Sequence, residues 1–338
     1  MTITFQVERN PSPNLCEAVA DTAPTNPFYT PQYVGCKRSQ ARSLWMLLLR
    51  EENRLVSGCP AFVKNGLFTR SLEIESLPAI PDPGVFCEGL LGACREAHIS
   101  EVCVHTAASS STNIPQTPGE TSRRKRCEFV IDLQNVDLWR QLRPSHRWRI
   151  NRSRKAGVNA SKTSGLQAWQ CHLEAVRASI DRRRGRGERF AEIKNVQWLE
   201  GVMESGQGEL YQAELGNEVV SSALVVKAKR GAYYFWAGTS ATGMAVGASH
   251  LLIHEIANQL QTQAVDILNL GGTDLQNKGL IEFKRGFGAR EILLEDVDLY
   301  LGSRTRRLLG RAFELLKEDR RDFFKRGVER LVGSPARP

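Results

Sequence analysis

The first part of the chain shows apolar runs of strand length around one helical stretch. Residues 44–50 and 54–63 flank the turn at 51–53, and this pattern predicts a β-hairpin. Residues 83–97 carry apolar side chains at helical spacing behind Pro83, and a strand is expected at 101–106. Residues 10–35 and 107–126 are rich in turn-forming and polar residues and predict loops, the first with a short helix. A strand at 127–133 completes a mixed α/β unit.

The rest of the chain repeats the order of strands, helix and strand. Helices are expected at 137–156, 166–178 and 196–203, and strands at 209–215, 219–228 and 232–237. A strongly periodic helix at 248–262 precedes a strand at 265–270, a short helix at 279–284 and a strand at 292–301. A basic amphipathic pattern follows at 305–332. We therefore predict two similar halves, 1–134 and 135–302, and a helical tail, 303–338. The shared order hints at an ancient duplication.

Composition narrows the function classes only in part. The chain has 338 residues and a formal net charge of +9, which suits an anionic partner such as nucleic acid, an acyl-CoA or an acidic membrane surface. The eight cysteines are scattered without a CxxC pair, which favours buried thiols in a reducing compartment over a zinc site. No signal-peptide pattern opens the sequence, and no apolar run is long enough to span a membrane. We expect a cytoplasmic protein.

A segment rich in small residues leads into the helix at 248–262. Unpaired N–H groups at a helix start, surrounded by small side chains, form a site for a pyrophosphate. The residues that would form it are Gly243, Gly247, Ala248 and Ser249. The alternative is a flexible turn in which Ser249 is an ordinary helix cap.

The next segment, 268–290, places charged side chains near the end of a strand. It holds Asp274, Lys278, Glu282, Lys284 and Arg285, and sites in α/β proteins favour strand ends. The alternative is a solvated helix with ion pairs such as that of Asp274 with Lys278.

Other candidate motifs are weaker. His250 and His254 have the spacing of a two-histidine metal site, but the order HxxxHE is not HExxH and no third ligand is evident. We therefore expect no metal. The basic segments 140–155 and 182–189 suit RNA phosphates, but aromatic residues do not alternate with the arginines, which favours a solvated surface. The tail fits a membrane surface or packing on its own domain.

Three segments together resemble a known family. The runs GASHLLIHE (247–255), LNLGGT (268–273) and NKGLIEFKRGFGA (277–289), with LRPSHRWRINRSRKAGV (142–158), are similar to the BioF-like or CelD-like acyltransferase domain of the GNAT superfamily, which is related to the Fem-type peptidyltransferases. The resemblance covers roughly 135–300 well and the first half weakly, mainly through NPFYTPQYV (26–34) and the hairpin after it.

The resemblance implies a tandem GNAT fold with a cleft between the halves, and transfer of an acyl group to an amine. Fem-type relatives position the acyl carrier with a Phe-Lys pair, which Phe283 and Lys284 match, so Lys284 would hold a phosphate or stabilise the oxyanion. The sequence departs from GNAT patterns at two places. The phosphate loop begins with Met244, and Phe283 stands where many relatives have a tyrosine general acid.

The remaining catalytic candidates follow from the reaction. An amine must lose a proton, and Asp274 and Glu282 are the nearest acidic candidates. Tyr233 or Tyr234 would replace the missing tyrosine, and strand alternation points only one of them toward the cleft; we choose Tyr234.

Three functions remain open. The first is an N-acyltransferase that moves an acyl group from acyl-CoA to an amine-bearing small molecule or peptide. The second is an aminoacyl-tRNA-dependent transferase of the Fem type acting on a peptide-like acceptor. The third is a non-catalytic GNAT-shaped protein of polysaccharide or envelope synthesis, against which the Phe283-Lys284 pair counts.

Overall fold

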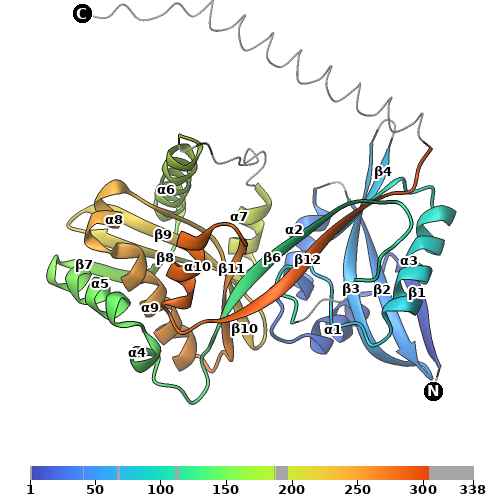
Figure 1. Cartoon of the computed structure of the whole chain (residues 1–338), viewed down its shortest axis with the longest axis horizontal. Coiled ribbons are helices and arrows are strands. Elements are labelled where there is room, and N and C mark those ends of the chain that lie inside the picture. Colours follow the sequence, from blue (N-terminus) through green and yellow to red (C-terminus); the bar gives the residue numbers. More distant parts are fainter. Residues whose placement is uncertain are drawn as a thin grey trace, which may run out of the picture.

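A twelve-stranded mixed sheet runs through the whole molecule, with helices on its faces (Figure 1). The computed structural model describes residues 2–40, 42–66, 69–110, 114–185, 187 and 197–303. The strand order is β1-β2-β3-β4-β5-β12-β6-β11-β10-β9-β8-β7. Neighbouring strands are antiparallel except for two pairs, β4 with β5 and β10 with β11. The α/β fold class is confirmed.

The first half contains the hairpin, helix and strands that the pattern predicts. Its elements are β1 (Ile3–Arg9), α1 (Pro13–Thr22), the 3-10 turn η1 (Pro27–Tyr29), α2 (Pro31–Arg38), β2 (Ser43–Glu51), β3 (Arg54–Asn65), β4 (Arg70–Ile74), α3 (Pro83–Glu96), β5 (Glu101–Val104) and β6 (Glu120–Asp132).

The second half also follows the predicted order. Its elements are α4 (Leu138–Gln141), α5 (Pro144–Lys155), β7 (Val158–Thr163), α6 (Leu166–Arg184), α7 (Gln197–Glu204), β8 (Gly208–Leu215), β9 (Glu218–Lys227), β10 (Gly231–Thr239), α8 (Ala241–Val246), α9 (Ala248–Thr262), β11 (Ile267–Asp274), α10 (Lys278–Arg285) and β12 (Arg290–Tyr300).

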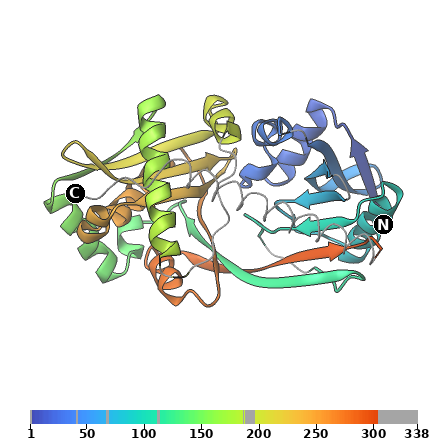
Figure 2. The ribbon, with the colours of Figure 1, turned by 90° about the horizontal axis from the view of Figure 1, so that it is seen from above.

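The two halves mirror each other and exchange one strand. Strands β1 to β5 and strands β7 to β11 occur in the same order from each outer edge of the sheet to its centre. At the centre, β6 of the first half pairs with β11, and β12 of the second half pairs with β5. Figure 2 shows β6 and β12 running together between the halves. The division at 134/135 stays a prediction, because this one sheet joins both halves.

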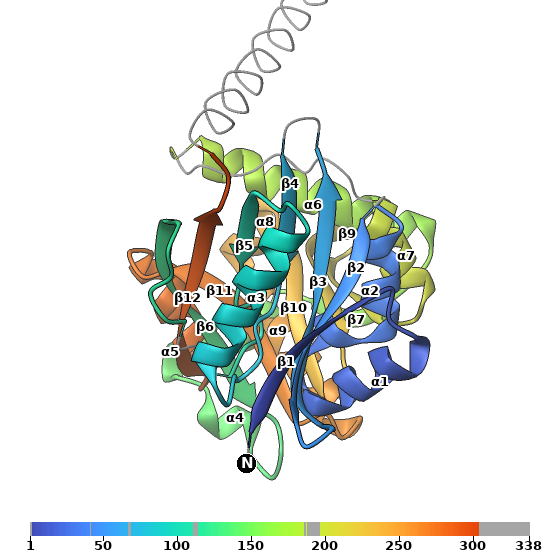
Figure 3. The same ribbon diagram turned by 90° about the vertical axis from the view of Figure 1, so that its right-hand side faces the viewer.

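Helices cover both faces of the second half. In β9, Ala223 and Val225 belong to the core around α9, whereas Leu224 and Val226 belong to the larger core that includes the first half and Trp169 of α6. Since side chains alternate along a strand, α9 and α6 lie on opposite faces. Figure 3 shows the first half from its outer side, with α3 across its sheet.

The prediction of a loop over the whole segment 107–126 was wrong. Strand β6 already begins at Glu120. The arginines of β6 are tolerated in a strand because carboxylate groups accept hydrogen bonds from them. Arg123 bonds Glu120 at 2.8 Å, and Arg124 bonds Asp296 at 2.8 Å. The charged residues at the start of β6 therefore made the first half of a central strand look like a loop in the sequence.

Three other local expectations were wrong. Residues 10–35 contain the helices α1 and α2 rather than mostly loop, and strand β1 precedes them. The single helix at 137–156 is two helices, because Pro144 disfavours helical backbone at the residue before it and starts α5 instead. The small-residue segment before 248 forms the short helix α8, which the Ser240 hydroxyl caps through Gly243 N at 3.1 Å. Most of the basic segment 182–189 and residues 304–338 of the tail lie outside the described residues.

Candidate active site

The parallel strands β10 and β11 pair over three residues and then part. Gly231 to Tyr233 pair with Ile267 to Asn269, and beyond them β10 is bulged. Strand β11 is bulged against β6 between Asn269 and Gly272. Gly271 has a φ of 75° within this bulge, a conformation that side chains other than glycine rarely adopt. The bulge turns backbone carbonyl groups out of the sheet ladder.

Lys284 lies at this bulge and is buried. Its side chain comes from α10, only 6% of the residue is exposed, and Nζ donates to Gly271 O at 2.7 Å and Gly272 O at 3.0 Å. The Nζ atom also lies 5.7 Å from the centre of the Phe129 ring. Burial lowers the pKa of Lys284 to about 8. An ammonium has three donors, so one N–H remains for a ligand in the described structure.

Phe283 of α10 is held by a cluster of rings from α5, from α9 and from the turn that follows α10. Its ring lies 5.0 Å from the His250 ring, 5.8 Å from His146 and 5.2 Å from Phe287, measured between centroids. His146 Nε2 donates to Phe283 O at 2.8 Å. Burial lowers the pKa of both histidines, that of His250 to about 3, so both are neutral at pH 7. The cluster fixes α10 and therefore the position of the lysine that follows Phe283.

The two histidines of the sequence motif have different surroundings. His250 belongs to the ring cluster, whereas His254 contacts the Trp139 ring at 5.4 Å and Asn258 at 3.3 Å. In the described ranges, no group of three or more His, Cys, Asp or Glu side chains is arranged to hold a metal ion.

The small residues at the start of α9 are packed rather than open. Gly247 has a φ of 83° and joins α8 to α9, and a Cβ there would lie 3.0 Å from Arg149 O. A Cβ on Gly243 would lie 2.1 Å from Val220 O. Ala248 is buried and Ser249 is half-buried. Some N–H groups at the start of each helix already donate hydrogen bonds, in α8 to the Ser240 hydroxyl and in α9 to Gly247 O.

This segment nevertheless lies beside α10. His250, three residues after Gly247, contacts the Phe283 ring, so the start of α9 and the Phe283-Lys284 pair lie on the same face of the sheet. The structure therefore brings together two of the segments that the sequence predicted as one site.

The predicted acids have other neighbours. Asp274 is exposed, and its carboxylate accepts from Gln276 N at 3.3 Å in a turn. Glu282 is exposed and pairs with Arg143 and, at 3.0 Å, with Arg285, and both arginines hold the pKa of its carboxyl below the usual value. Neither carboxylate bonds Lys284, and their catalytic roles stay predictions.

Tyr234 is half-buried against the α9 face of the sheet, and burial raises the pKa of its phenol. Its neighbour Tyr233 points to the opposite face, where Oη donates to Glu128 Oε1 at 2.9 Å. Alternation therefore separates the two tyrosines, as the sequence predicts.

Glu128 is a buried carboxylate that the sequence did not reveal. It is fully buried, and besides Tyr233 it accepts from Asn269 Nδ2 at 2.7 Å, from Ala108 N at 2.9 Å and from the Arg126 guanidinium. Glu128 therefore ties β6, β10 and β11 to the segment after β5. A single Glu within the apolar run of β6 was the signal that sequence reasoning passed over.

The chain shares its second half with a known family. Residues 140–285 match the family described as the acetyltransferase (GNAT) domain. This part of the chain is a GNAT acyltransferase domain. It contains His146, His250 and Phe283 of the ring cluster, the start of α9 and Lys284, whereas Phe287 and Glu128 lie outside it. The chain is therefore an acyltransferase, as the resemblance in the sequence implies.

Solved structures show the same fold over almost the whole chain. FemX is 11% identical, with 88% of this chain and 97% of that chain covered and a TM-score of 0.64. A tandem GNAT protein from the clavulanic acid biosynthesis pathway is 12% identical, with 89% and 99% covered and a TM-score of 0.54. L-PGS from Bacillus licheniformis is 14% identical, with 90% and 99% covered and a TM-score of 0.51. No curated protein matches the sequence. The tandem GNAT fold is thus confirmed.

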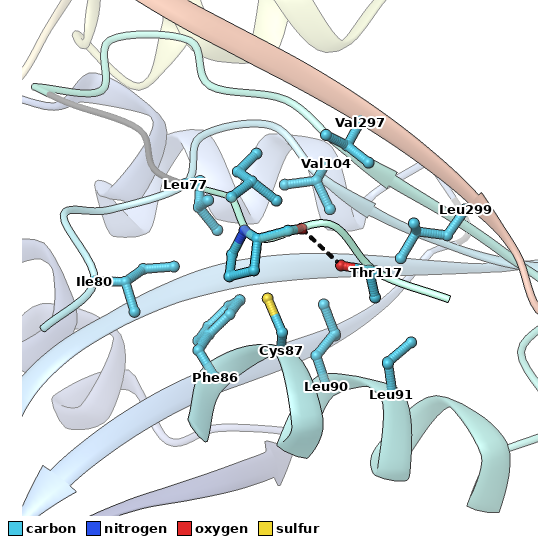
Figure 4. A pocket seen from close by; sticks show the side chains of 12 residues that line it. Leu77, Ile80, Phe86, Cys87, Leu90, Leu91, Val104, Thr117, Val297 and Leu299 are labelled. Atoms are coloured by element: carbon cyan, nitrogen blue, oxygen red, sulfur yellow. Dashed lines mark hydrogen bonds between the residues drawn. The ribbon is translucent and has the colours of Figure 1, made fainter. Parts of the chain in front are cut away.

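The described part of the chain also has hollows away from the ring cluster. A groove of about 430 Å³ lies between the halves, where Asp21 and Gln32 of the first half face Gln207 and Lys229 of the second. An apolar cavity of about 20 Å³ lies in the first half under α3, with Cys87 on its wall (Figure 4). That volume holds about one water molecule, so the cavity is too small for an acyl chain as it stands.

The described part of the chain contains no helix that is long and apolar enough to cross a membrane.

Proposed function

We propose that the chain transfers an acyl group from acyl-CoA to a primary amine, with the reacting carbonyl beside Lys284. The observation that carries this proposal is the buried ammonium at the point where β10 and β11 part, held by Gly271 O and Gly272 O. A cytoplasmic location belongs to the same proposal.

The reaction requires little from the protein. The amine nitrogen attacks the thioester carbonyl, whose oxygen becomes an oxyanion in the tetrahedral intermediate. The free N–H of Lys284 donates to that oxygen in a site shielded from water, where such donors stabilise charge most. The intermediate collapses to the amide and releases the CoA thiolate, and the proton lost by the amine goes to water and then to the thiolate.

An aminoacyl-tRNA donor is the second candidate. The attack on an ester carbonyl would use the same lysine. One observation favours this donor: the segment expected to bind a pyrophosphate is folded into α8 and packed against Arg149. A non-catalytic role is the third candidate, and the buried charge of Lys284 counts against it, because a buried charge is expensive to maintain.

The test is a pair of lysine variants on α10. Lys284→Met removes the ammonium, and Lys278→Met removes an exposed one from the same helix. We expect at least a hundredfold loss of kcat in the first, as for other oxyanion donors, and a change of less than twofold in the second. Equal activity of both variants would refute the site.

A thermal-shift comparison identifies the donor. A ligand at a hundred times its Kd stabilises the folded chain by about 2.7 kcal/mol. Acyl-CoA thioesters should raise Tm, and uncharged tRNA serves as the control for aminoacyl-tRNA. A shift with aminoacyl-tRNA alone would replace the first candidate by the second.

A further inference from the structure

The exposed face of α5 carries one aromatic ring between two guanidinium groups. Trp148 is 57% exposed. Among the large hydrophobic side chains that are exposed in the described ranges, it is the only aromatic residue. The Arg149 and Arg152 guanidinium carbons lie 5.5 and 5.4 Å from its ring centre. Two cations therefore lie within cation–π distance of an indole that is exposed to solvent.

The positive charge of this face is not neutralised. Helix α5 contains no acidic residue. Arg154 is bonded to Glu255 at 2.8 Å, but no carboxylate in the described chain pairs with Arg149 or Arg152. An exposed ring flanked by free guanidinium groups suits a ligand that combines a flat base with phosphates.

The opposite face of the same helix forms one wall of the candidate active site. His146 packs on the His250 and Phe283 rings, and Arg149 O lies against Gly247. Arg149 therefore links the exposed face that carries Trp148, Arg149 and Arg152 (the Trp148 face) to the start of α9, on the side of the sheet that holds Lys284.

We propose that Trp148, Arg149 and Arg152 bind the 3′-phosphoadenosine diphosphate end of the acyl-CoA donor. This inference rests on the function proposed above. The adenine stacks on the indole, and the two guanidinium groups bind the 3′-phosphate and the pyrophosphate. The pantetheine arm then passes Gly247 and the Phe283 ring to bring the thioester to Lys284.

Two other anionic partners fit this face less well. Sites for single-stranded nucleic acid use several aromatic rings for successive bases, and α5 exposes one. Helices that lie in a membrane surface bury a continuous apolar face, whereas α5 offers only Trp148 to the solvent side.

The experiment compares two donors in the full chain. Acyl-CoA contains the nucleotide, and acyl-pantetheine has the same thioester without it. In Trp148→Ala and Arg152→Ala, we expect kcat/KM for acyl-CoA, relative to that for acyl-pantetheine, to fall about tenfold, the equivalent of about 1.4 kcal/mol. Trp148→Phe, which keeps a ring, should recover part of this ratio. Arg154→Ala removes one charge from the same helix and should leave the ratio within twofold.

Each other outcome overturns the inference. An equal loss for both donors would mean that α5 only supports the active site, and an unchanged ratio would mean that the nucleotide binds elsewhere. RNA binding with a steep salt dependence, lost in the same variants and tighter than CoA binding, would assign the face to a polymer.

A binding measurement separates this inference from the proposed function. If the wild-type chain transfers acyl groups from neither donor, the proposed function fails, but calorimetry with adenosine 3′,5′-bisphosphate still tests the face. Binding that is lost in Arg152→Ala and kept in Arg154→Ala supports the inference. No binding by the wild-type chain overturns it.

Discussion

The depressed pKa of Lys284 predicts an unusual dependence of stability on pH. Burial lowers this pKa from 10.5 to about 8. In the window between these values the unfolded chain holds the proton and the folded chain does not, so the free energy of unfolding rises with pH there. Each pKa unit corresponds to about 1.36 kcal/mol, so the full effect is about 3 kcal/mol.

The assay is urea unfolding of the wild-type chain and Lys284→Met at a series of pH values from 6.0 to 9.5. Other groups titrate in both proteins, so the difference between their unfolding free energies isolates the lysine. Between pH 8 and 9.5 this difference should shift by about 2 kcal/mol in favour of the wild type. Below pH 8 it should be constant.

The same titration should govern activity. If the ammonium donates to the oxyanion, kcat falls as pH rises through about 8, because the folded lysine loses its proton there. Parallel stability curves for the two proteins would refute a buried ammonium of lowered pKa at this position. A rate that does not decline up to pH 9.5 would refute its donation to the oxyanion.

Three further predictions concern packing around the site. Glu128→Ala removes the carboxylate that accepts from Arg126, Tyr233 and Asn269 and leaves the Arg126 guanidinium with Asp296 Oδ2 at 3.7 Å. It should lower the unfolding free energy by about 3–5 kcal/mol, measured by urea denaturation; a loss below about 1 kcal/mol would contradict an anchoring role. Gly286→Ala places a Cβ about 2.0 Å from the His146 ring, so it should destabilise the chain, and His146→Ala in the same chain should restore part of the loss in a double-mutant cycle. Gly247→Ala should cost about 1–2 kcal/mol, because its φ is 83°, whereas Gly92→Ala, in a helix with open space around it, should be neutral or stabilising by up to about 1 kcal/mol.

Local patterns were sufficient to predict most elements. The helix expected at 248–262 is α9 with the same limits, because its apolar face is periodic and Gly247 marks its start. The hairpin β2–β3 was equally clear, since two apolar runs flank a short turn. Both elements depend on contacts within a few residues.

Elements that depend on distant partners were harder to predict. Strand β6 was half concealed because its arginines pair with Glu295 and Asp296 of β12, far away in the sequence. The Glu128 cluster was missed for the same reason: its donors come from β10, β11 and the segment after β5. The exposure of Trp148 could not be predicted, because the sequence shows one tryptophan among arginines but not which side of the helix faces solvent.

The exchanged strands have a consequence for synthesis on the ribosome. Strand β5 has its second neighbour only when residues 290–300 exist. Until then the nascent first half presents an unpaired strand edge, which invites pairing with other chains. Both halves are therefore completed only after β12 has been synthesised, and a gene truncated before β12 would yield two unfinished sheets.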